Sequence, residues 1–384
     1  MSEIGIGVIG CGAMGRVNVR HLLKEQAGLK LIGIVDPDPK AAGKLETQLG
    51  EPVRAFDTEE QLLACDEIDW VIIASLNSQH AAQTIAAFNA GKHVFCQKPL
   101  ALNLEDCLAM REAQRRNNRQ FNIGFTLRYS PHYRRIRALI DEGVIGDIVS
   151  MDFNETLPFN HGGFIMGDWR REREVAGTFL LEKCCHDIDL ANWMTGARVS
   201  RVASFGGLNF FVPENEHHIA RLGKNKRGQQ AYRTWQDGSG ANPFSAEKSI
   251  VDNQVAILEY ESGVRACFHI NANAGIPERR MYILGTEGAI RADVLTGSIE
   301  AQRIGFETQI EQHATGASGG HGDGDKVWAA ELAATMLQST PPVASIEEGL
   351  AAAVTCFAID KAMESGTVED MAAYWQQVEE YGRV

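Results

Sequence analysis

Apolar runs alternate with helical patterns through the first third of the chain. Continuous apolar runs are typical of parallel strands that are buried on both faces. The runs lie at 4–9, 31–35, 53–56, 70–74, 93–96 and 120–124. Helical patterns between the later runs lie at 41–49, 59–64, 80–90 and 104–117. Short apolar strands separated by helices predict a doubly wound parallel sheet.

The pattern changes after a helix predicted at 131–142. Several of the segments that follow alternate apolar with polar residues, as strands do when one face is buried and the other is open. These segments lie at 148–155, 199–208, 254–260, 264–272 and 280–284. Turn signals at 261–263 and 285–288 separate neighbouring segments. A mixed or antiparallel sheet with one open face is therefore predicted.

The stretches 158–167, 213–247 and 315–324 are expected to be loops, and 213–247 is polar, glycine-bearing and charged. Helical segments are predicted at 327–337 and 346–365. The predicted fold class is α/β. A doubly wound parallel sheet at 1–124 precedes an α+β domain at 125–384 that contains a large open, mostly antiparallel sheet.

Composition narrows the possible partners. The chain has 384 residues and a net charge of -13, which argues against a nucleic-acid or anionic-membrane surface. Its 8 cysteines form no Cys-x-x-Cys pair, so we expect reduced thiols and a cytoplasmic location. The first strand begins at Ile4, which leaves no space for a secretory leader, and no apolar stretch is long enough to span a membrane.

A glycine turn follows the first apolar run. Gly10 can take the positive φ of a tight strand-to-helix turn, Gly12 lets the backbone approach a pyrophosphate, and Gly15 lets the helix pack closely. Ala13 and Met14 complete the first helical turn, whose N–H groups can hold phosphate oxygens. This turn predicts a dinucleotide site.

Asp36 ends the second apolar run, about twenty residues after the last glycine of the turn. A carboxylate there accepts hydrogen bonds from both ribose hydroxyls and repels a 2′-phosphate, so NAD is favoured over NADP. Asp36 could instead be a turn residue before Pro37, and Lys40 nearby keeps NADP possible.

Polar residues follow the third and fourth strands of the predicted parallel sheet, at 74–80 and 97–100. Ligands of open α/β sheets bind at the carboxyl ends of the strands. The candidate cofactor-binding residues at these exits are Ser75, Asn77, His80, Gln97 and Lys98.

In the second domain, Glu182, His186 and Asp189 lie at spacings of four and three within a predicted helix. Residues at these spacings share one helix face. Two carboxylates and an imidazole on one face are candidate groups for proton transfer.

These motifs together resemble those of the glucose-fructose oxidoreductase, inositol dehydrogenase and rhizopine-catabolism family, written Gfo/Idh/MocA. The resemblance covers nearly the whole chain and rests on the glycine turn, Asn77 with His80, Lys98-Pro99, Gly124-Phe125, Arg128-Tyr129, the 143–146 turn, Asp168-Trp169-Arg170, and the helix with His186 and Asp189. It implies a Rossmann domain followed by a substrate-binding and oligomerisation domain. It also implies an NAD(P)-dependent oxidoreductase acting on sugars, anhydrosugars or cyclitols, assembled as a homodimer or homotetramer.

The resemblance also implies roles for single residues. His186 would take the hydroxyl proton of a secondary alcohol, because an imidazole titrates closest to neutral pH. Lys98 would stabilise alkoxide character on the same oxygen, and Glu182 would orient the imidazole or bind a neighbouring hydroxyl. The expected substrate-binding residues are Arg128, Trp169, Arg170 and Asp189, and no metal is expected.

Two positions depart from the family pattern. Gln97 stands where the family usually has Glu before Lys-Pro, and Glu182 stands where it usually has Asp four residues before the histidine. Gln97 can still hydrogen-bond a ribose or nicotinamide amide but adds no charge. Glu182 keeps the carboxylate, so catalysis is expected to persist with altered substrate placement.

Structural roles compete with several of these assignments. His186 could be a satisfied structural residue, Lys98 a surface lysine, and Glu182 a partner of Lys183 or Arg170. Asp189 could cap local structure, and Trp169 and Arg170 could belong to the core rather than to a sugar-facing platform. The pair Cys184-Cys185 fits apolar packing better than a metal site, and His217-His218 is expected to be solvated.

Three functions stay open from the sequence. The first is a sugar or cyclitol dehydrogenase. The second is a glycosidase that uses NAD for transient oxidation followed by elimination. The third is an idle nucleotide-binding sensor, against which Lys98 and His186 argue, because such a protein has no chemical need for either side chain.

Overall fold

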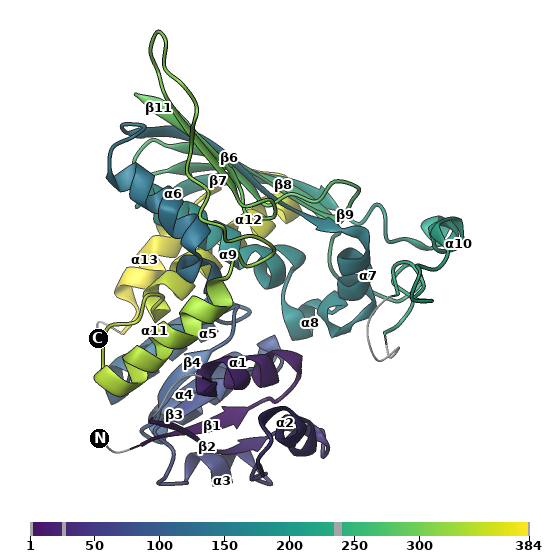
Figure 1. Cartoon of the computed structure of the whole chain (residues 1–384), viewed down its shortest axis with the longest axis vertical. Helices are drawn as coiled ribbons and strands as arrows, with labels where there is room; N and C mark the ends of the chain where they lie inside the picture. Colours follow the sequence, from purple (N-terminus) through teal and green to yellow (C-terminus); the bar gives the residue numbers. More distant parts are fainter. Residues whose placement is uncertain (1–2, 25–27, 234–239, 383–384) are drawn as a thin grey trace. The chain divides into compact units, whose positions relative to one another are not determined.

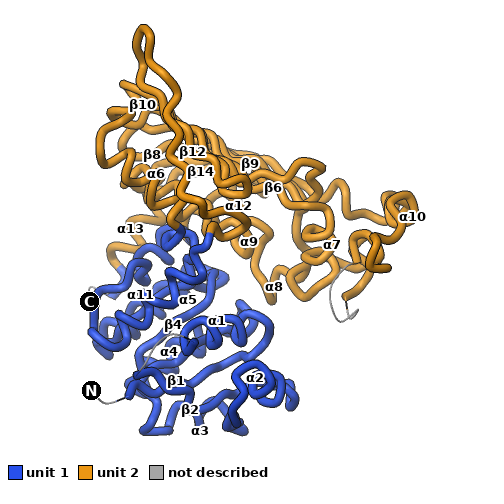
Figure 2. The backbone as a smooth tube through the Cα atoms, in the orientation of Figure 1, with its two compact units in different colours: residues 1–130, 323–353, 381–384 blue, residues 131–322, 354–380 orange. Residues whose placement is uncertain are grey.

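The computed structural model describes residues 3–24, 28–233 and 240–382, and six residues of the predicted 213–247 loop lie outside them. The chain forms two compact units (Figure 2). Unit 1 comprises residues 1–130, 323–353 and 381–384, and unit 2 comprises residues 131–322 and 354–380. These units differ from the predicted division into 1–124 and 125–384 chiefly because the segment 323–353 joins the first unit.

Unit 1 contains a parallel five-stranded sheet in the order β2-β1-β3-β4-β5 (Figure 1). Its strands are β1 (Ile4–Ile9), β2 (Leu29–Val35), β3 (Trp70–Ile73), β4 (His93–Cys96) and β5 (Phe121–Ile123). The predicted strand at 53–56 is reduced to a single bridge between Ala55 and Ile34. The doubly wound sheet predicted from the apolar runs is confirmed.

Helices cover both faces of this sheet. They are α1 (Ala13–Leu23), α2 (Ala41–Leu49), α3 (Glu59–Leu63), α4 (His80–Asn89), α5 (Leu104–Asn117) and α11 (Gly324–Gln338). Trp328, Leu332 and Met336 of α11 belong to the same buried cluster as Val8 of β1 and Leu22 of α1. Burial of these side chains in the first core explains why α11, so late in the sequence, belongs to unit 1.

Unit 2 is built on a nine-stranded sheet in the order β13-β12-β11-β10-β6-β9-β8-β7-β14. Its strands are β6 (Ile148–Pro158), β7 (Val199–Gly207), β8 (Asn253–Tyr260), β9 (Arg265–Ala274), β10 (Arg280–Gly285), β11 (Gly288–Asp293), β12 (Ser298–Arg303), β13 (Glu311–Gln312) and β14 (Glu369–Asp370). Only the β6–β9 pair is parallel among these described strands. The predicted large, mostly antiparallel sheet is confirmed.

One face of the nine-stranded sheet packs against helices, and the other is open (Figure 1). The larger helices are α6 (Pro131–Asp141), α9 (Phe179–Thr195), α12 (Ile346–Ser365) and α13 (Ala372–Glu380). On the open face Phe205, Val255 and Ile257 are exposed, Phe205 by 69% and Ile257 by 60%. The alternation seen in the sequence therefore reports a sheet with one buried face, as predicted.

The stretch 158–167, expected to be a loop, is mostly the helix α7 (Phe159–Gly167). The prediction of a loop is wrong because glycines, three in this stretch, do not exclude a helix that packs closely. A Cβ at Gly162 would lie 1.7 Å from the Ala272 carbonyl oxygen of β9, so glycine here permits a helix to lie directly against a strand. The short helix α8 (Arg173–Ala176) follows.

The stretch 213–247 also contains structure that its polarity concealed, namely α10 (His217–Leu222). Aromatic rings of Phe210, Phe211, Tyr232 and Phe244 pack together beside it, with centroids 5.1 to 5.9 Å apart. His217 is exposed, as expected, whereas His218 is half-buried and stacks on Phe210 with ring centroids 5.4 Å apart.

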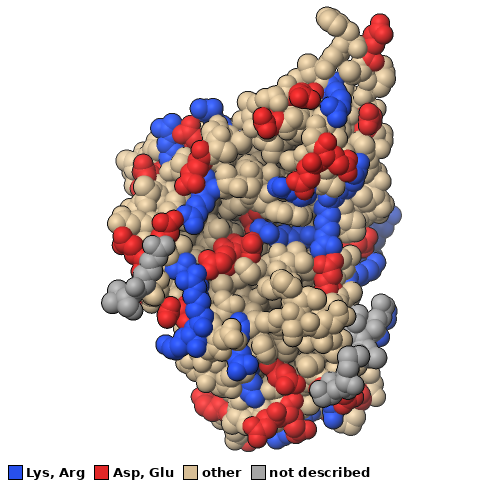
Figure 3. Space-filling model, turned by 90° about the vertical axis from the view of Figure 1, so that its left-hand side faces the viewer, with Lys and Arg blue, Asp and Glu red and all other residues tan. Residues whose placement is uncertain are grey.

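Charges of both signs are interspersed on the face drawn in Figure 3. Within the described residues, no helix combines the length and apolar character that a membrane crossing needs.

Candidate functional site

The carboxyl ends of the unit 1 strands form one edge of the parallel sheet. The strands β1, β2, β3 and β4 are followed there by Gly10, Asp36, Ser75 and Lys98. The topology therefore brings together residues that are up to 88 positions apart, 98 − 10, in the sequence. This edge is the cofactor side of the candidate site.

The glycine turn leaves its backbone uncovered. Gly10 has φ +83°, and a Cβ on it would lie 2.5 Å from the Ser75 nitrogen. A Cβ on Gly15 would lie 2.3 Å from the Gly10 carbonyl oxygen, whereas one on Gly12 would meet no described atom within 4 Å. Gly12 caps α1 without a side-chain hydrogen bond, so the first turn, with Ala13 and Met14, presents backbone N–H groups to a phosphate.

Asp36 is held beside this turn by two backbone donors. Its Oδ2 accepts a hydrogen bond from the Cys11 N–H at 2.6 Å, and its Oδ1 accepts one from the Asp38 N–H at 2.8 Å. The carboxylate is thereby oriented at the end of β2, where a ribose is held in dinucleotide-binding folds. Asp36 is also a turn residue, because the hydrogen bond that its side chain accepts from the Asp38 N–H closes a local turn.

His80 begins α4 and is completely buried. Its Nδ1 lies 2.8 Å from the Pro99 carbonyl oxygen, and burial lowers its pKa to about 4, so the ring is neutral. A fully buried imidazole does not reach a ligand, so the structure favours a role for His80 in positioning the segment after β4. Asn77, in the preceding turn, is also buried.

Gln97, which stands directly before Lys98, has a buried side-chain amide whose Nε2 has no hydrogen-bond partner among the described residues. Leaving such a donor unsatisfied costs on the order of 1–3 kcal/mol. Its Oε1 lies against Gly124, where a Cβ would come within 2.7 Å. An unsatisfied donor at this edge fits a bound oxygen acceptor, and Lys98 beside it is half-buried. Together with the open glycine turn, Gln97 makes this edge suitable for a dinucleotide.

Arg128, expected to bind substrate, lies in the short helix Thr126–Tyr129 that follows β5. It is buried and belongs to unit 1, at the same edge of the sheet as the cofactor residues.

A separate group of candidate residues lies on α9 in unit 2. Thr178 caps this helix by accepting a hydrogen bond from the Leu181 N–H at 3.1 Å. Glu182, His186 and Asp189 are all buried on α9, with His186 only 4% exposed. Burying three ionisable side chains on one helix is costly unless each is hydrogen-bonded or paired. Such an arrangement is common at functional sites.

Glu182 pairs with Arg170, whose Nε lies 3.3 Å from Oε1. Arg170 also contacts the Asp168 carboxylate at 2.6 Å. Its guanidinium lies over the rings of Trp169 and Phe164, at 4.3 and 4.8 Å from their centroids. The half-buried Trp169 and Arg170 thus form a stacked polar surface joined to α9, rather than a part of the apolar core.

Two histidines that the sequence interpretation did not select also belong to this region. His161 lies on α7, and burial, reinforced by Lys183, lowers its pKa to about 4. The ring of His321 lies 6.1 Å from that of His186, centroid to centroid. Both residues were placed in predicted loops, where periodicity carries no information on side-chain contacts. The presence of an imidazole was the only available signal.

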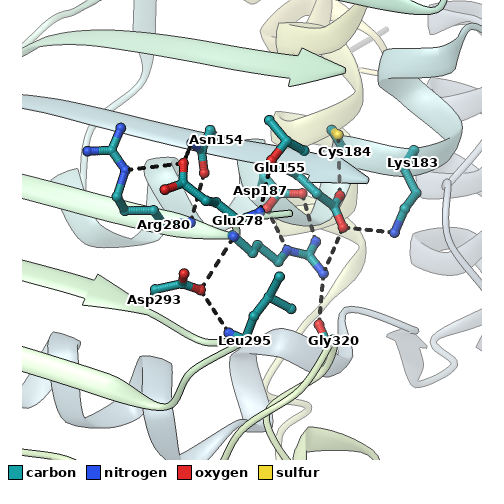
Figure 4. Close-up of polar contacts among 12 residues, drawn as sticks. Asn154, Glu155, Lys183, Cys184, Asp187, Glu278, Arg280, Asp293, Leu295 and Gly320 are labelled. Atoms are coloured by element: carbon teal, nitrogen blue, oxygen red, sulfur yellow. Dashed lines mark hydrogen bonds and ion pairs between the residues drawn. The ribbon is translucent and has the colours of Figure 1, made fainter. Parts of the chain in front are cut away.

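A buried network of charged side chains joins α9 to β6 and to Arg279 (Figure 4). Arg279 donates two hydrogen bonds to Asp187, from Nε to Oδ1 at 2.8 Å and from Nη2 to Oδ2 at 2.7 Å. Glu155 of β6 lies 3.3 Å from Arg279 and accepts a hydrogen bond from Lys183 at 2.9 Å. Although burial alone raises the pKa of Glu155, these two cations hold it well below its usual range.

Glu155, Cys184 and Asp187 bring their possible metal-ligand atoms within 4.8 Å of one another. Arg279 and Lys183 already neutralise both carboxylates, however, and burial raises the pKa of the Cys184 thiol well above its usual value. A metal ion would have to displace the guanidinium. This cluster is therefore explained as an ion-pair network, and Cys184 packs as a small buried side chain.

The chain matches two family models. Residues 4–125 match the model described as "Oxidoreductase family, NAD-binding Rossmann fold", and residues 133–291 match the "GFO/IDH/MocA C-terminal domain". Inositol 2-dehydrogenase of Burkholderia cenocepacia (strain HI2424) is 23% identical over 385 residues, which cover 96% of each chain.

Solved structures share the fold over nearly the whole chain. Levoglucosan dehydrogenase in complex with NADH and levoglucosan gives a TM-score of 0.78 at 20% identity, covering 97% of this chain and 100% of that chain. The apo scyllo-inositol dehydrogenase of Lactobacillus casei gives 0.74 at 22% identity, covering 97% and 99%. The predicted fold class and the predicted NAD-binding domain are confirmed.

The N-terminal cap of α9 predicts that the stability of the protein depends on pH. Asp360 of α12 accepts hydrogen bonds from Thr178 at 2.5 Å and from Gln254 at 3.2 Å, and burial raises its pKa to about 6. A raised pKa stabilises the fold below about pH 4, and this contribution is lost as the pH rises through 6. Relative to Asp360→Asn, the native chain should therefore lose about 2–3 kcal/mol of unfolding free energy between pH 4 and pH 7.

Urea unfolding of both proteins across this pH range measures the difference. Glu347→Gln, which alters an exposed carboxylate on the same helix, is the matched control, and its stability relative to the native chain should show no such dependence on pH. A difference between the native chain and Asp360→Asn that is independent of pH would contradict the assignment.

Proposed function

The chain belongs to the Gfo/Idh/MocA family of oxidoreductases, and on this basis we propose that it transfers a hydride between NAD and a secondary alcohol of a sugar, anhydrosugar or cyclitol. The observation that carries this proposal is the buried face of α9. Glu182, His186 and Asp189 place two carboxylates and an imidazole on one helix, next to the stacked Trp169–Arg170 surface. The names of the related dehydrogenases support the same substrate class.

Bound NAD would supply the hydride chemistry. Gly10, Gly12 and Gly15, with Ala13 and Met14, would hold its phosphates. Asp36 would bind a ribose, while Ser75, Asn77 and Gln97 would line the remaining edge, with His80 positioning Lys98 from behind. Because the Asp36 carboxylate is oriented at the end of β2 and would repel a 2′-phosphate, we infer a preference for NAD over NADP.

His186 would accept the hydroxyl proton as the alcohol is oxidised. Lys98 would stabilise the negative charge that develops on the same oxygen. Glu182, oriented by Arg170, would align the imidazole or a neighbouring hydroxyl, and Asp189, Arg128, Trp169 and Arg170 would bind the remaining polar groups of the substrate. In this proposal Lys98 and His186 act on one substrate atom.

A substrate panel tests the activity. We expect NADH to accumulate, measured by its absorbance, when the protein and NAD are mixed with one of myo-inositol, scyllo-inositol, levoglucosan and common aldoses. Lys98→Ala and His186→Ala should each lower kcat/KM by about 10²- to 10⁴-fold. Lys326→Ala and His217→Ala, which remove exposed residues of the same types, should leave it unchanged.

Activity that survives both Lys98→Ala and His186→Ala would disprove the assigned site. Release of an aglycone from glycosides, with no net change in NADH, would show that the protein acts as the redox-neutral glycosidase and not as a dehydrogenase. Binding of NAD with no turnover of any sugar, cyclitol or glycoside would favour the idle sensor.

Cofactor preference is tested at Asp36. Asp36→Ser removes the ribose acceptor and the repulsion of a 2′-phosphate, so the ratio of Kd for NADP to Kd for NAD should fall by about 10- to 100-fold. Asp38→Ser is the control, since Asp38 pairs with Lys44 on the surface. Titration of intrinsic fluorescence with each nucleotide gives both constants, and an unchanged ratio would remove Asp36 from the cofactor site.

We also propose that two or more copies associate through the open face of the nine-stranded sheet, as a homodimer or homotetramer. Phe205, Val255 and Ile257 lie together on adjacent strands β7 and β8, and leaving such apolar surface in water is unfavourable. Sedimentation of the native chain should show a dimer or tetramer that Ile257→Asp dissociates. Ile276→Asp, outside the strands, should not; a monomeric native chain would contradict the proposal.

A further inference from the structure

His321 lies beside His186 although 135 positions, 321 − 186, separate them in the sequence. The ring centroids are 6.1 Å apart and the rings are inclined by 54°. The two imidazoles differ in their access to water, because His186 is buried and His321 is half-buried. At this separation two ring nitrogens can exchange a proton through a single water molecule.

Arg279 forms hydrogen bonds to a residue adjacent in sequence to each of the two histidines. Its guanidinium pairs through two hydrogen bonds with Asp187, the residue after His186. Its Nη1 also donates a hydrogen bond of 3.0 Å to the carbonyl oxygen of Gly320, the residue before His321. Figure 4 shows Asp187 and the Gly320 carbonyl on two separate segments that this network joins.

The anchor is rigid for two reasons. Arg279 is buried and keeps its charge at every accessible pH. Burial raises the pKa of its partner Asp187 to about 6, so the ion pair is complete above that pH. Its planar guanidinium donates in fixed directions to Asp187, Glu155 and Gly320. The loop around His321 is rich in glycines, with positive φ at Gly319 and Gly322.

We propose that His321 relays the substrate proton from His186 to solvent and that Arg279 is the positioning residue for this pair. The inference rests on the proposed function. As the alcohol becomes a carbonyl, its carbon-bound hydrogen leaves with two electrons to NAD⁺, and its hydroxyl proton goes to His186. The proton then passes to His321 and on to water, which restores neutral His186 for the next turnover. The reverse reaction uses the same path.

A relay is needed because a buried base must lose its proton before it can act again. His186 is only 4% exposed, so water alone has little access to it. His321 is half-buried and reaches solvent, so a second imidazole there can carry the proton in either direction.

The first test is kinetic and uses myo-inositol and levoglucosan as probes. His321→Ala should lower kcat about 10-fold or more while KM changes little, and should increase the solvent deuterium isotope effect on kcat. Added imidazole should restore much of the lost rate. Arg279→Lys keeps the charge but loses the planar fork, so it should lower kcat in the same way, whereas the matched control Arg280→Lys, a partner of Asp152, should not.

The second test needs no substrate. In protein labelled at the histidine ring carbons, the pH dependence of the His186 signal should differ between the native chain and His321→Asn, because neighbouring imidazoles titrate as a coupled pair. Glu182, Asp187 and Asp189 lie on the same helix as His186 in both proteins, so they do not produce such a difference. NAD binding by His321→Asn should equal that of the native chain.

The outcomes separate this inference from the proposed function. If His186→Ala is inactive while His321→Ala has native kcat and isotope effect, the relay is wrong and the function stands. If imidazole fails to rescue His321→Ala, or if the His186 signal titrates in the same way in the native chain and in His321→Asn, the relay is also overturned. If His186→Ala is fully active, the proposed function itself fails.

Discussion

The pairing of Arg279 with Asp187 and Glu155 is the interaction on which the arrangement of unit 2 depends. Buried charges are tolerated only when they are paired and hydrogen-bonded, and removing one partner typically costs about 3–5 kcal/mol. Because Asp187 lies on α9 and Glu155 on β6, satisfying the guanidinium sets the rotation of the helix against the sheet. That rotation determines the direction in which the neighbouring Glu182 and His186 face. The network contains two cations, Arg279 and Lys183, and two anions, Asp187 and Glu155, and its charges also act on His161 of α7.

The candidate binding edge of unit 1 depends on backbone geometry and not on ion pairs. The backbone of the glycine turn is available because side chains are missing, and the close approaches at Gly10 and Gly15 exclude even a methyl group. A parallel sheet then brings the ends of its strands to one edge, whatever lies between them in the sequence. The cofactor-binding edge is therefore determined by the exposed backbone of the glycine turn and by the order of the parallel strands. The site of unit 2 is made of side chains held by ion pairs, stacking and a helix cap.

Much of the candidate site could be predicted because its signals are local. The glycine turn, Asp36 and the spacing of Glu182, His186 and Asp189 follow from neighbouring residues and helical geometry. The partners of these residues could not be predicted in the same way. Glu182 had two plausible cations in the sequence, and the structure selects Arg170 while Lys183 turns to Glu155. His161 and His321 went unselected because each belongs to a glycine-bearing stretch in which periodicity is absent.

The sequence by itself determined the class of fold and most of its elements, since burial on one or both faces imposes a periodicity on a strand or helix. It could not determine which distant segments share a core. Trp328 packs against Phe95, at 4.8 Å between ring centroids, and so attaches α11 to unit 1, while Gly162 permits a helix where composition indicated a loop. Only the tertiary structure determines these contacts and the proximity of His186 to His321. Packing and ion pairing join residues by their distance in space, which local patterns along the chain do not encode.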